Sequence, residues 1–90
     1  MDLELKGQAV LVTGAGSGIG QAIALAFAAE GAAVAVNDLT RERCQETLEL
    51  LQPTGVPAMA APFDVTRLDD VRASIGEVHD RFGRLDVLVN

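Results

Sequence analysis

The residues best suited to chemistry in this 90-residue sequence are the glycines of a short segment near its amino terminus. Residues 13–20, with the sequence TGAGSGIG, lie between an apolar run and a helical pattern. Glycines at such a junction let backbone N–H groups approach a phosphate closely, and the positive end of the helix dipole attracts an anion. The segment therefore predicts a phosphate site built from main-chain donors.

The next residue suited to ligand binding is a carboxylate that follows the second apolar run. Asp38 lies about 20 residues after Gly18, the spacing at which a carboxylate accepts hydrogen bonds from the hydroxyls of an adenosine ribose. Its charge would repel a phosphate on the ribose 2′ position, whereas Arg41 is close enough along the chain to attract one. These residues favour NAD(H) over NADP(H) as the nucleotide and leave NADP(H) open.

The spacing of the glycines excludes two widespread phosphate-binding motifs. G-x-G-x-x-G fails as a literal match, because Ile19 stands where its third glycine belongs. A Walker A loop is excluded because no Gly-Lys-Ser or Gly-Lys-Thr follows, and the single lysine, Lys6, precedes the first apolar run. The glycine segment therefore follows neither of these two motifs.

Four strands must position these residues. Short apolar, β-branched runs predict them at residues 9–13, 33–36, 56–63 and 85–89. The third is the weakest, because Pro57 and Pro62 cannot donate ladder hydrogen bonds, and it belongs at a sheet edge.

Three helices are predicted between the strands. The first runs from Gly18 to the turn at Gly31, while Thr40 and Thr66 are the expected amino-terminal caps of the second and third. The apolar positions expected to face the sheet are Ile19, Ala22, Ile23, Ala26, Phe27, Cys44, Leu48, Leu51, Leu68, Val71, Ile75, Val78 and Phe82. Alternating strands and helices predict an α/β, doubly wound fold, with a parallel sheet in the order 3-2-1-4 and helices on both faces.

The composition argues against several kinds of partner. Thirteen acidic and seven basic residues give a net charge of −6, which opposes binding to nucleic acid and to anionic membrane surfaces. The single cysteine cannot form an internal disulfide, no apolar run reaches the roughly 18 residues of a membrane-spanning helix, and no signal peptide is recognisable. We expect a cytoplasmic protein without a metal site, in which Cys44 belongs to the core and His79 to a helix surface.

The glycine segment fits the pattern T-G-x-x-x-G-I-G, and on this pattern the sequence resembles the short-chain dehydrogenase/reductase family. The resemblance implies a partial Rossmann fold that binds a dinucleotide. It implies that Asp64 meets the adenine amino group, that Val65 packs on the adenine ring, and that Asn90 begins an Asn-Asn-Ala-Gly motif. Ser17 occupies a position where NADP-using relatives often carry a basic residue, which again favours NAD. The cofactor-binding residues expected on this basis are Gly14, Ser17, Gly18, Ile19, Gly20, Asp38, Leu39, Asp64, Val65 and Asn90.

For two of these residues a purely structural role stays open. The alternative for Asp64 is a turn or helix-capping residue, and the alternative for Asn90 is the polar end of a strand.

The catalytic residues of the family have no counterpart in these 90 residues. The resemblance implies a Tyr-x-x-x-Lys pair with an upstream Ser and Asn, yet the sequence has no tyrosine and its only lysine is Lys6. We therefore expect residues 1–90 to be the amino-terminal part of an incomplete dinucleotide-binding domain that is inactive by itself. The full-length enzyme is expected to transfer hydride between NAD(H) and an alcohol or carbonyl substrate, and to form the homo-oligomers typical of the family.

Two other functions are compatible with the residues. The first is a nucleotide-binding half of an S-adenosylmethionine-dependent methyltransferase, since Gly14, Gly16 and Gly18 also suit that loop, although Thr13 stands where an acidic residue is expected. The second is a binding module that holds NAD without turnover. Measurements of binding to NADH, NADPH and S-adenosylmethionine distinguish these functions from one another.

Overall fold

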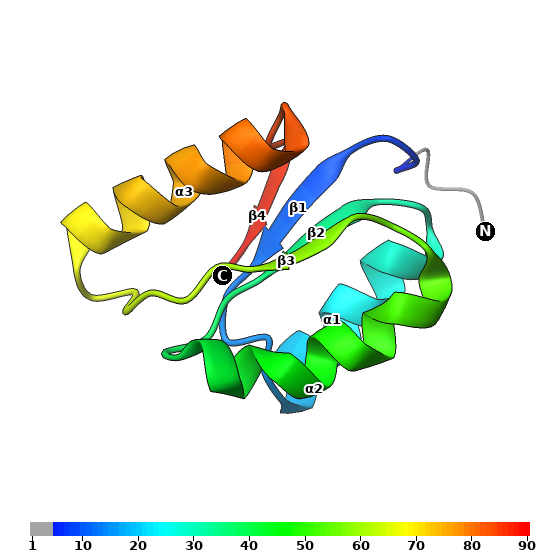
Figure 1. The fold of residues 1–90 in the computed structure, drawn as a ribbon, viewed down its shortest axis with the longest axis horizontal. Helices are drawn as coiled ribbons and strands as arrows, with labels where there is room; N and C mark the ends of the chain where they lie inside the picture. The colour runs from blue at the N-terminus through cyan, green and yellow to red at the C-terminus, as the bar shows by residue number, and fades with distance from the viewer. Residues whose placement is uncertain (1–4) are drawn as a thin grey trace.

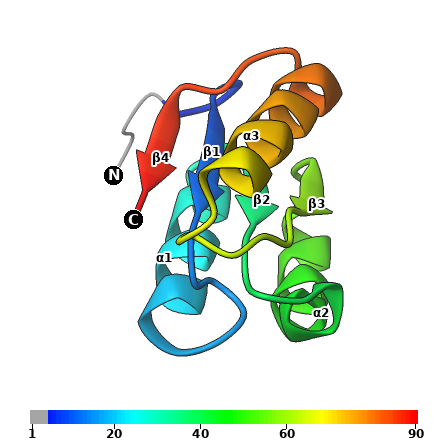
Figure 2. The ribbon, with the colours of Figure 1, turned by 90° about the vertical axis from the view of Figure 1, so that its left-hand side faces the viewer.

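Four parallel strands form one sheet in the computed structural model, which describes residues 5–90. They are β1 (Ala9–Val12), β2 (Ala33–Val36), β3 (Ala58–Ala60) and β4 (Val87–Val89). Their order across the sheet is β3-β2-β1-β4, so the predicted order is confirmed (Figure 2). Each strand is only three or four residues long. Such short strands can form a stable parallel sheet because helices bury both of its faces.

Three helices cover the two faces of this sheet. Helices α1 (Gly18–Ala29) and α2 (Arg41–Leu51) lie on one face, and α3 (Leu68–Phe82) lies on the other (Figure 1). A short 3₁₀ turn, η1 (Gln52–Thr54), follows α2 and ends at Gly55, which has a left-handed φ of 75°. The prediction that helices cover both faces of the sheet is therefore confirmed. None of the described helices is long and apolar enough to cross a membrane.

The core consists of two layers, one on each side of the sheet. Alternate side chains of a strand point to opposite faces, so Val10 and Val12 pack against α1 and α2 while Leu11 packs beneath α3. Leu51 completes the first layer and Val78 the second, and each is fully buried. Because both faces of β1 and β2 are covered, neither strand contains a polar residue.

The face of α1 that meets the sheet differs from the prediction. Ala24 and Ala28 are its buried residues, whereas Ile19 is 81% exposed and Ala22 and Ala26 face solvent. Ile23 and Phe27 do pack against the core, as expected. The helix is apolar almost all round, so its periodicity does not select one face, and the small alanines are the residues that allow close approach to the strands.

The start of α3 also differs from the prediction. Thr66 does not cap it: the N-cap residue is Arg67, and Leu68, expected in the buried stripe, is 61% exposed. The backbone N–H and the hydroxyl of Thr66 both donate to Oδ1 of Asp64, at 2.9 and 2.7 Å. Thr66 therefore belongs to a turn that precedes the helix, and the N-cap position falls one residue later.

The third strand is shorter than the predicted run of residues 56–63. It spans Ala58–Ala60, with Pro57 just before it and Pro62 just after it, and it lies at one edge of the sheet. Backbone hydrogen bonds to the β2 segment continue past Pro62, because Ala61 donates to Val36 at 2.8 Å and Phe63 donates to Asp38 at 3.1 Å.

Candidate functional site

The carboxyl ends of the parallel strands point to one edge of the sheet, and the loops after β1, β2 and β3 gather there (Figure 2). The loop after β1 carries the glycine segment. Gly14 and Gly18 have left-handed φ angles of 60° and 59°, and a Cβ at Gly20 would lie 2.3 Å from the carbonyl oxygen of Gly14. The fold therefore requires glycine at these three predicted positions.

Gly16 is the point where this loop touches the loop after β2. A Cβ there would lie 2.2 Å from the carbonyl oxygen of Arg43 and 2.6 Å from Oδ2 of Asp38. Gly16 also donates its backbone N–H to the same Asp38 oxygen at 3.1 Å. A side chain at this position would separate the two loops.

The amino terminus of α1 is open to an anion. Its N-cap residue, Ser17, makes no side-chain capping bond, and its first turn carries no acidic residue. By contrast, Thr40 caps α2 by accepting from the backbone N–H of Arg43, as predicted, and α2 and α3 both have acidic residues in their first turns. The unneutralised helix dipole of α1 can therefore stabilise a negative group placed at its start.

Asn37 joins the three loops and was not among the predicted site residues. Its side chain is fully buried, accepts from the backbone N–H of Gly14 at 3.2 Å, and donates to the carbonyl oxygens of Ala61 at 2.9 Å and Phe63 at 3.2 Å. Its backbone carbonyl also accepts from Ala15 at 2.7 Å. The amide thus fixes the loops after β1 and β3 to the end of β2.

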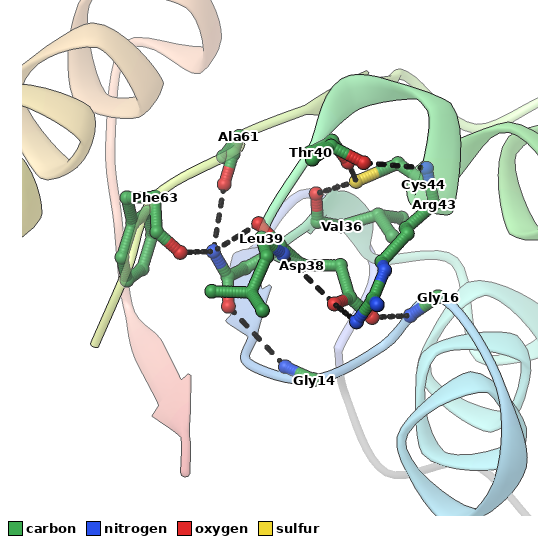
Figure 3. Close-up of polar contacts among 11 residues, drawn as sticks. Gly14, Gly16, Val36, Asp38, Leu39, Thr40, Arg43, Cys44, Ala61 and Phe63 are labelled. Carbon is green, nitrogen blue, oxygen red and sulfur yellow. Dashed lines mark hydrogen bonds and ion pairs between the residues drawn. The ribbon is translucent and has the colours of Figure 1, made fainter. Parts of the chain in front are cut away.

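Asp38 lies next to the glycine loop with its carboxylate 16% exposed (Figure 3). Oδ2 accepts from Gly16, and Oδ1 accepts from the backbone N–H of Leu39 at 2.8 Å. The nearest arginine is Arg43, whose Nη1 lies 3.7 Å from Oδ1. Arg41, which the sequence indicates as a cation close enough to attract a 2′-phosphate, makes no ion pair with Asp38 among the described residues.

Two polar side chains on the helices also hold the glycine loop, and neither was predicted from the sequence. The buried Thr47 hydroxyl on α2 donates to the carbonyl oxygen of Ala15 at 2.7 Å. Gln21 on α1 donates to that hydroxyl at 3.0 Å and to the carbonyl oxygen of Gly16 at 3.4 Å. The one sequence feature that indicates this contact is Thr47 itself, a polar residue at a helix position that belongs to the apolar face.

A pocket of about 330 Å³ opens at this edge of the sheet. Its lining residues are Thr13, Gly14, Asn37, Asp38, Leu39, Phe63, Val65 and Asn90. Five of the ten predicted site residues are among them. Leu39 and Val65 are each 54% exposed, so the pocket offers apolar surface beside the Asp38 carboxylate. The other predicted residues are the four at the start of α1 and Asp64, which adjoins Val65.

The last two predicted residues make structural contacts of their own. Asp64 accepts from Thr66, and these hydrogen bonds hold the pKa of the Asp64 carboxyl below its ordinary value. Asn90 accepts at Oδ1 from the hydroxyl of Thr13 at 3.1 Å, and the backbone N–H of Thr13 donates to Val89 at 2.9 Å. The turn at Asp64 agrees with the structural role left open for that residue. The contact of Asn90 with Thr13, where β4 ends beside β1, agrees with the role left open for Asn90.

Cys44 and His79 lie where they were expected. Cys44 is buried and donates to the carbonyl oxygen of Val36 at 3.3 Å, and burial raises the pKa of its thiol. His79 is on the outer surface of α3, with its side chain 63% exposed. Among residues 5–90, no three His, Cys, Asp or Glu side chains are grouped as metal ligands.

Known proteins match this arrangement over nearly the whole chain. Residues 8–90 match the family model described as short chain dehydrogenase. YxjF, an uncharacterised oxidoreductase of Bacillus subtilis strain 168, is 44% identical over 86 residues, which is 96% of this chain and 34% of that protein. The chain thus spans about a third of the length of this relative.

Solved structures agree with this match. L-Sorbose reductase from Gluconobacter frateurii, complexed with NADPH and L-sorbose, superposes with a TM-score of 0.92 at 36% identity, covering 100% of this chain and 35% of that one. NAD+-bound xylitol dehydrogenase superposes with a TM-score of 0.89 at 38% identity, covering 94% of this chain and 33% of that one.

Proposed function

The chain belongs to the short-chain dehydrogenase family, and from this premise we propose that it binds the adenosine diphosphate half of NAD(H) as the amino-terminal part of a dinucleotide-binding domain. The observation that carries the proposal is the joint position of the glycine loop and Asp38 at the carboxyl edge of the sheet, held together by the Gly16 hydrogen bond of 3.1 Å. Ligands of open α/β sheets bind at this edge.

Each group of residues has a role in this proposal. The backbone N–H groups of residues 17–20 meet the pyrophosphate at the open end of α1. Asp38 accepts from the ribose hydroxyls, and Leu39 and Val65 supply apolar contact for the adenine ring. Asp64 meets the adenine amino group, and Asn90 and Gly14 line the passage toward the nicotinamide half.

A dinucleotide fits the donors and acceptors that this chain presents. Its phosphates need N–H donors without a competing carboxylate, and α1 has no acidic residue in its first turn. Its ribose needs an acceptor that is fixed in position, and Asp38 is held by two main-chain N–H groups. NAD(H) is preferred over NADP(H), because the same carboxylate repels a 2′-phosphate.

The activity proposed for the whole protein is hydride transfer between NAD(H) and an alcohol or carbonyl substrate. The bound nicotinamide supplies or accepts the hydride, while residues 1–90 bind and orient the other end of the cofactor. The proton-transferring residues, the substrate contacts and the oligomer contacts of this family are assigned to the remaining two-thirds of such proteins. We accordingly propose that the 90-residue chain alone is inactive, and that the protein acts in the cytoplasm.

Isothermal titration of the chain with NAD+, NADP+ and S-adenosylmethionine tests the binding proposal. We expect NAD+ to bind, and Asp38→Ala to weaken it about tenfold or more, the size of one charge-assisted hydrogen bond. The control variant Asp80→Ala removes an 89% exposed carboxylate on α3 and should leave the affinity unchanged. Binding of S-adenosylmethionine in place of NAD+ would support the methyltransferase alternative and contradict the proposal.

An activity assay tests the second part of the proposal. The chain mixed with NADH and a panel of ketones should show no turnover above the uncatalysed rate. Turnover by the chain would show that its own residues carry the proton chemistry, and would contradict the assignment of these 90 residues to cofactor binding alone.

A further inference from the structure

The peptide unit that joins Ala15 to Gly16 lies in the middle of the glycine loop and is held from both sides. Its carbonyl oxygen accepts from the hydroxyl of Thr47 at 2.7 Å. Its N–H group donates to Oδ2 of Asp38 at 3.1 Å (Figure 3). A trans peptide unit is planar, and its carbonyl and N–H groups point in opposite directions. The hydroxyl on α2 therefore sets the orientation of the N–H group that meets the Asp38 carboxylate.

The Thr47 hydroxyl serves this peptide unit and not its own helix. A threonine inside a helix can donate to the carbonyl oxygen four residues earlier, which here belongs to Arg43. That carbonyl oxygen packs against Gly16, where a Cβ would clash with it. The fully buried hydroxyl donates instead to a carbonyl oxygen 32 residues away in sequence. The turn of α2 from Arg43 to Thr47 thus contacts both residues of the peptide unit.

Gln21 on α1 extends this arrangement by one more hydrogen bond. Its Nε2 donates to the hydroxyl oxygen of Thr47 at 3.0 Å and to the carbonyl oxygen of Gly16 at 3.4 Å. The donors follow one direction, from Gln21 through Thr47 and the peptide unit to the carboxylate of Asp38. Hydrogen bonds aligned in this way polarise one another in a buried environment. The negative charge of Asp38 lies at the accepting end of the series.

The Gly16 N–H group is the contact that fixes the Asp38 carboxylate relative to the glycine loop. The second main-chain donor to the carboxylate, at 2.8 Å, is Leu39, which is its neighbour in sequence and moves with it. The Arg43 guanidinium lies 3.7 Å from Oδ1 on a side chain that is 63% exposed, and such a pair contributes little. The distance between the carboxylate and the loop therefore depends on the orientation of one peptide unit.

We propose that Thr47 is a positioning residue for the adenosine ribose, supported by Gln21, although neither side chain belongs to the lining of the pocket described above. The inference rests on the proposed function, in which Asp38 accepts from the ribose hydroxyls. The Thr47 hydroxyl holds the peptide unit and the peptide unit holds the carboxylate, so the ribose meets an acceptor that is already ordered. The N–H groups that face the phosphates belong to residues 17–20, outside this peptide unit. Loss of the hydroxyl should therefore weaken recognition of the ribose more than binding of the phosphates.

Titration with ADP and with 2′,3′-dideoxy-ADP tests the inference, because the second ligand lacks the two ribose hydroxyls. The wild-type chain should bind ADP more tightly than the dideoxy ligand. Thr47→Val removes the hydroxyl and should reduce this preference about fivefold, the effect of about one hydrogen bond, whereas Thr47→Ser should keep it. Thr54→Val is the control, because the Thr54 hydroxyl donates to the carbonyl oxygen of Leu51, and it should also keep the wild-type preference.

Two further measurements separate positioning from a general loss of structure. In an Asp38→Ala chain, Thr47→Val should leave the ratio of the two dissociation constants unchanged, because the hydroxyl acts on the ribose only through the carboxylate. In the absence of nucleotide, the backbone amide NMR signal of Gly16 should move in Thr47→Val and return in Thr47→Ser. If Thr47→Val does not fold, Gln21→Met, at a half-buried position, should reduce the preference in the same direction by a smaller factor.

Three outcomes would overturn the inference. An unchanged preference for ADP in folded Thr47→Val, or in Gln21→Met where Thr47→Val is unfolded, shows that the carboxylate is held without the hydroxyl. An equal loss of affinity for both ligands shows a structural role alone, and an effect that persists in the Asp38→Ala chain shows that Thr47 acts elsewhere. Failure of the wild-type chain to bind ADP, or equal wild-type affinity for the two ligands, contradicts the proposed function itself.

Discussion

The carboxyl edge of the sheet, where the parallel strands end, and the lateral edge formed by β4 differ in the interactions that hold them in place. At the carboxyl edge, Asn37, Asp38 and Thr47 connect loops from three strands, and every buried side-chain N or O atom of residues 5–90 has a partner. At the other edge, β4 pairs with β1 alone, and its Leu88 is 52% exposed while its neighbour Leu11 is fully buried.

The loops at the carboxyl edge are held by hydrogen bonds between their own residues, whereas β4 has a neighbouring strand on one side only within residues 5–90. The β4 edge leaves backbone groups and apolar side chains open to another strand. Substitutions at the carboxyl edge should therefore change the free energy of unfolding, whereas substitutions at the β4 edge should change the association of chains with one another.

Asn37→Ala should have the largest effect, because it removes the amide that joins the three loops. The backbone N–H of Gly14 and the carbonyl oxygens of Ala61 and Phe63 lose a buried partner, at a cost of about 2–4 kcal/mol in the free energy of unfolding. Denaturant melts measure this loss. Gln45→Ala is the control, since Gln45 is exposed and its side chain bonds only to Glu49 at 3.3 Å. Equal stability of the two variants would contradict the role of Asn37.

Gly20→Ala and Gly76→Ala should change stability in opposite directions. Both glycines lie within helices, but a Cβ at Gly20 would meet the Gly14 carbonyl oxygen at 2.3 Å, and one at Gly76 meets nothing within 4 Å. Gly20→Ala should destabilise the fold by about 1–3 kcal/mol through overpacking, and Gly76→Ala should stabilise it by about 0.5–1 kcal/mol through helix propensity. Thermal melts of both variants check the signs. Stabilisation by Gly20→Ala would show that the loop is not tightly packed.

Leu88→Lys tests the open edge at β4. The wild-type chain should associate as its concentration rises, because an uncovered edge strand pairs readily with another, and a lysine on that strand should oppose the pairing. Sedimentation velocity over a range of concentrations measures the effect. Leu50→Lys adds the same charge at a 44% exposed position on α2 and should not reduce association. A wild-type chain that stays monomeric throughout would remove the contrast between the two edges.

The smallest effect is expected from acid, at the start of β4. Arg84 donates to both oxygens of Asp86, Ala9 donates its backbone N–H to Oδ2, and these contacts lower the pKa of the Asp86 carboxyl from its ordinary 3.8. A lowered pKa means that the stabilisation is fully present above about pH 4 and is lost as the pH falls through the lowered value. Asp86→Asn should flatten this part of the pH–stability curve. An identical acid slope in wild type and variant would show that the contact adds nothing.

The fold could be predicted because its signals are local. Strand runs, glycine turns and proline positions each lie within a few residues, and the parallel order follows from their alternation. The buried face of α1 could not be predicted, since a helix that is apolar almost all round leaves the choice of face to packing.

The site could be predicted only in part, for two physical reasons. Asn37 was missed because its partners, Gly14, Ala61 and Phe63, are far from it in sequence and reach it only in the folded sheet. The ion pair of Arg43 with Asp38 could not be predicted, because proximity along the chain does not determine direction on a helix, where Arg41 and Arg43 differ by about 200°. The position of Gly14 and Asp38 at this edge of the sheet could be predicted because motif spacing encodes their place.

The most direct test of the central claim is an NMR titration of the isotopically labelled chain with NAD+. If the carboxyl edge is a preformed nucleotide site, the backbone amide signals of residues 14–20, 38–39 and 64–65 should shift in a saturable way, led by Gly16 and the start of α1. Signals at the opposite edge of the sheet, near Lys6 and Arg81, should stay in place. Absence of saturable shifts, or shifts centred on Lys6 and Arg81, would contradict the account.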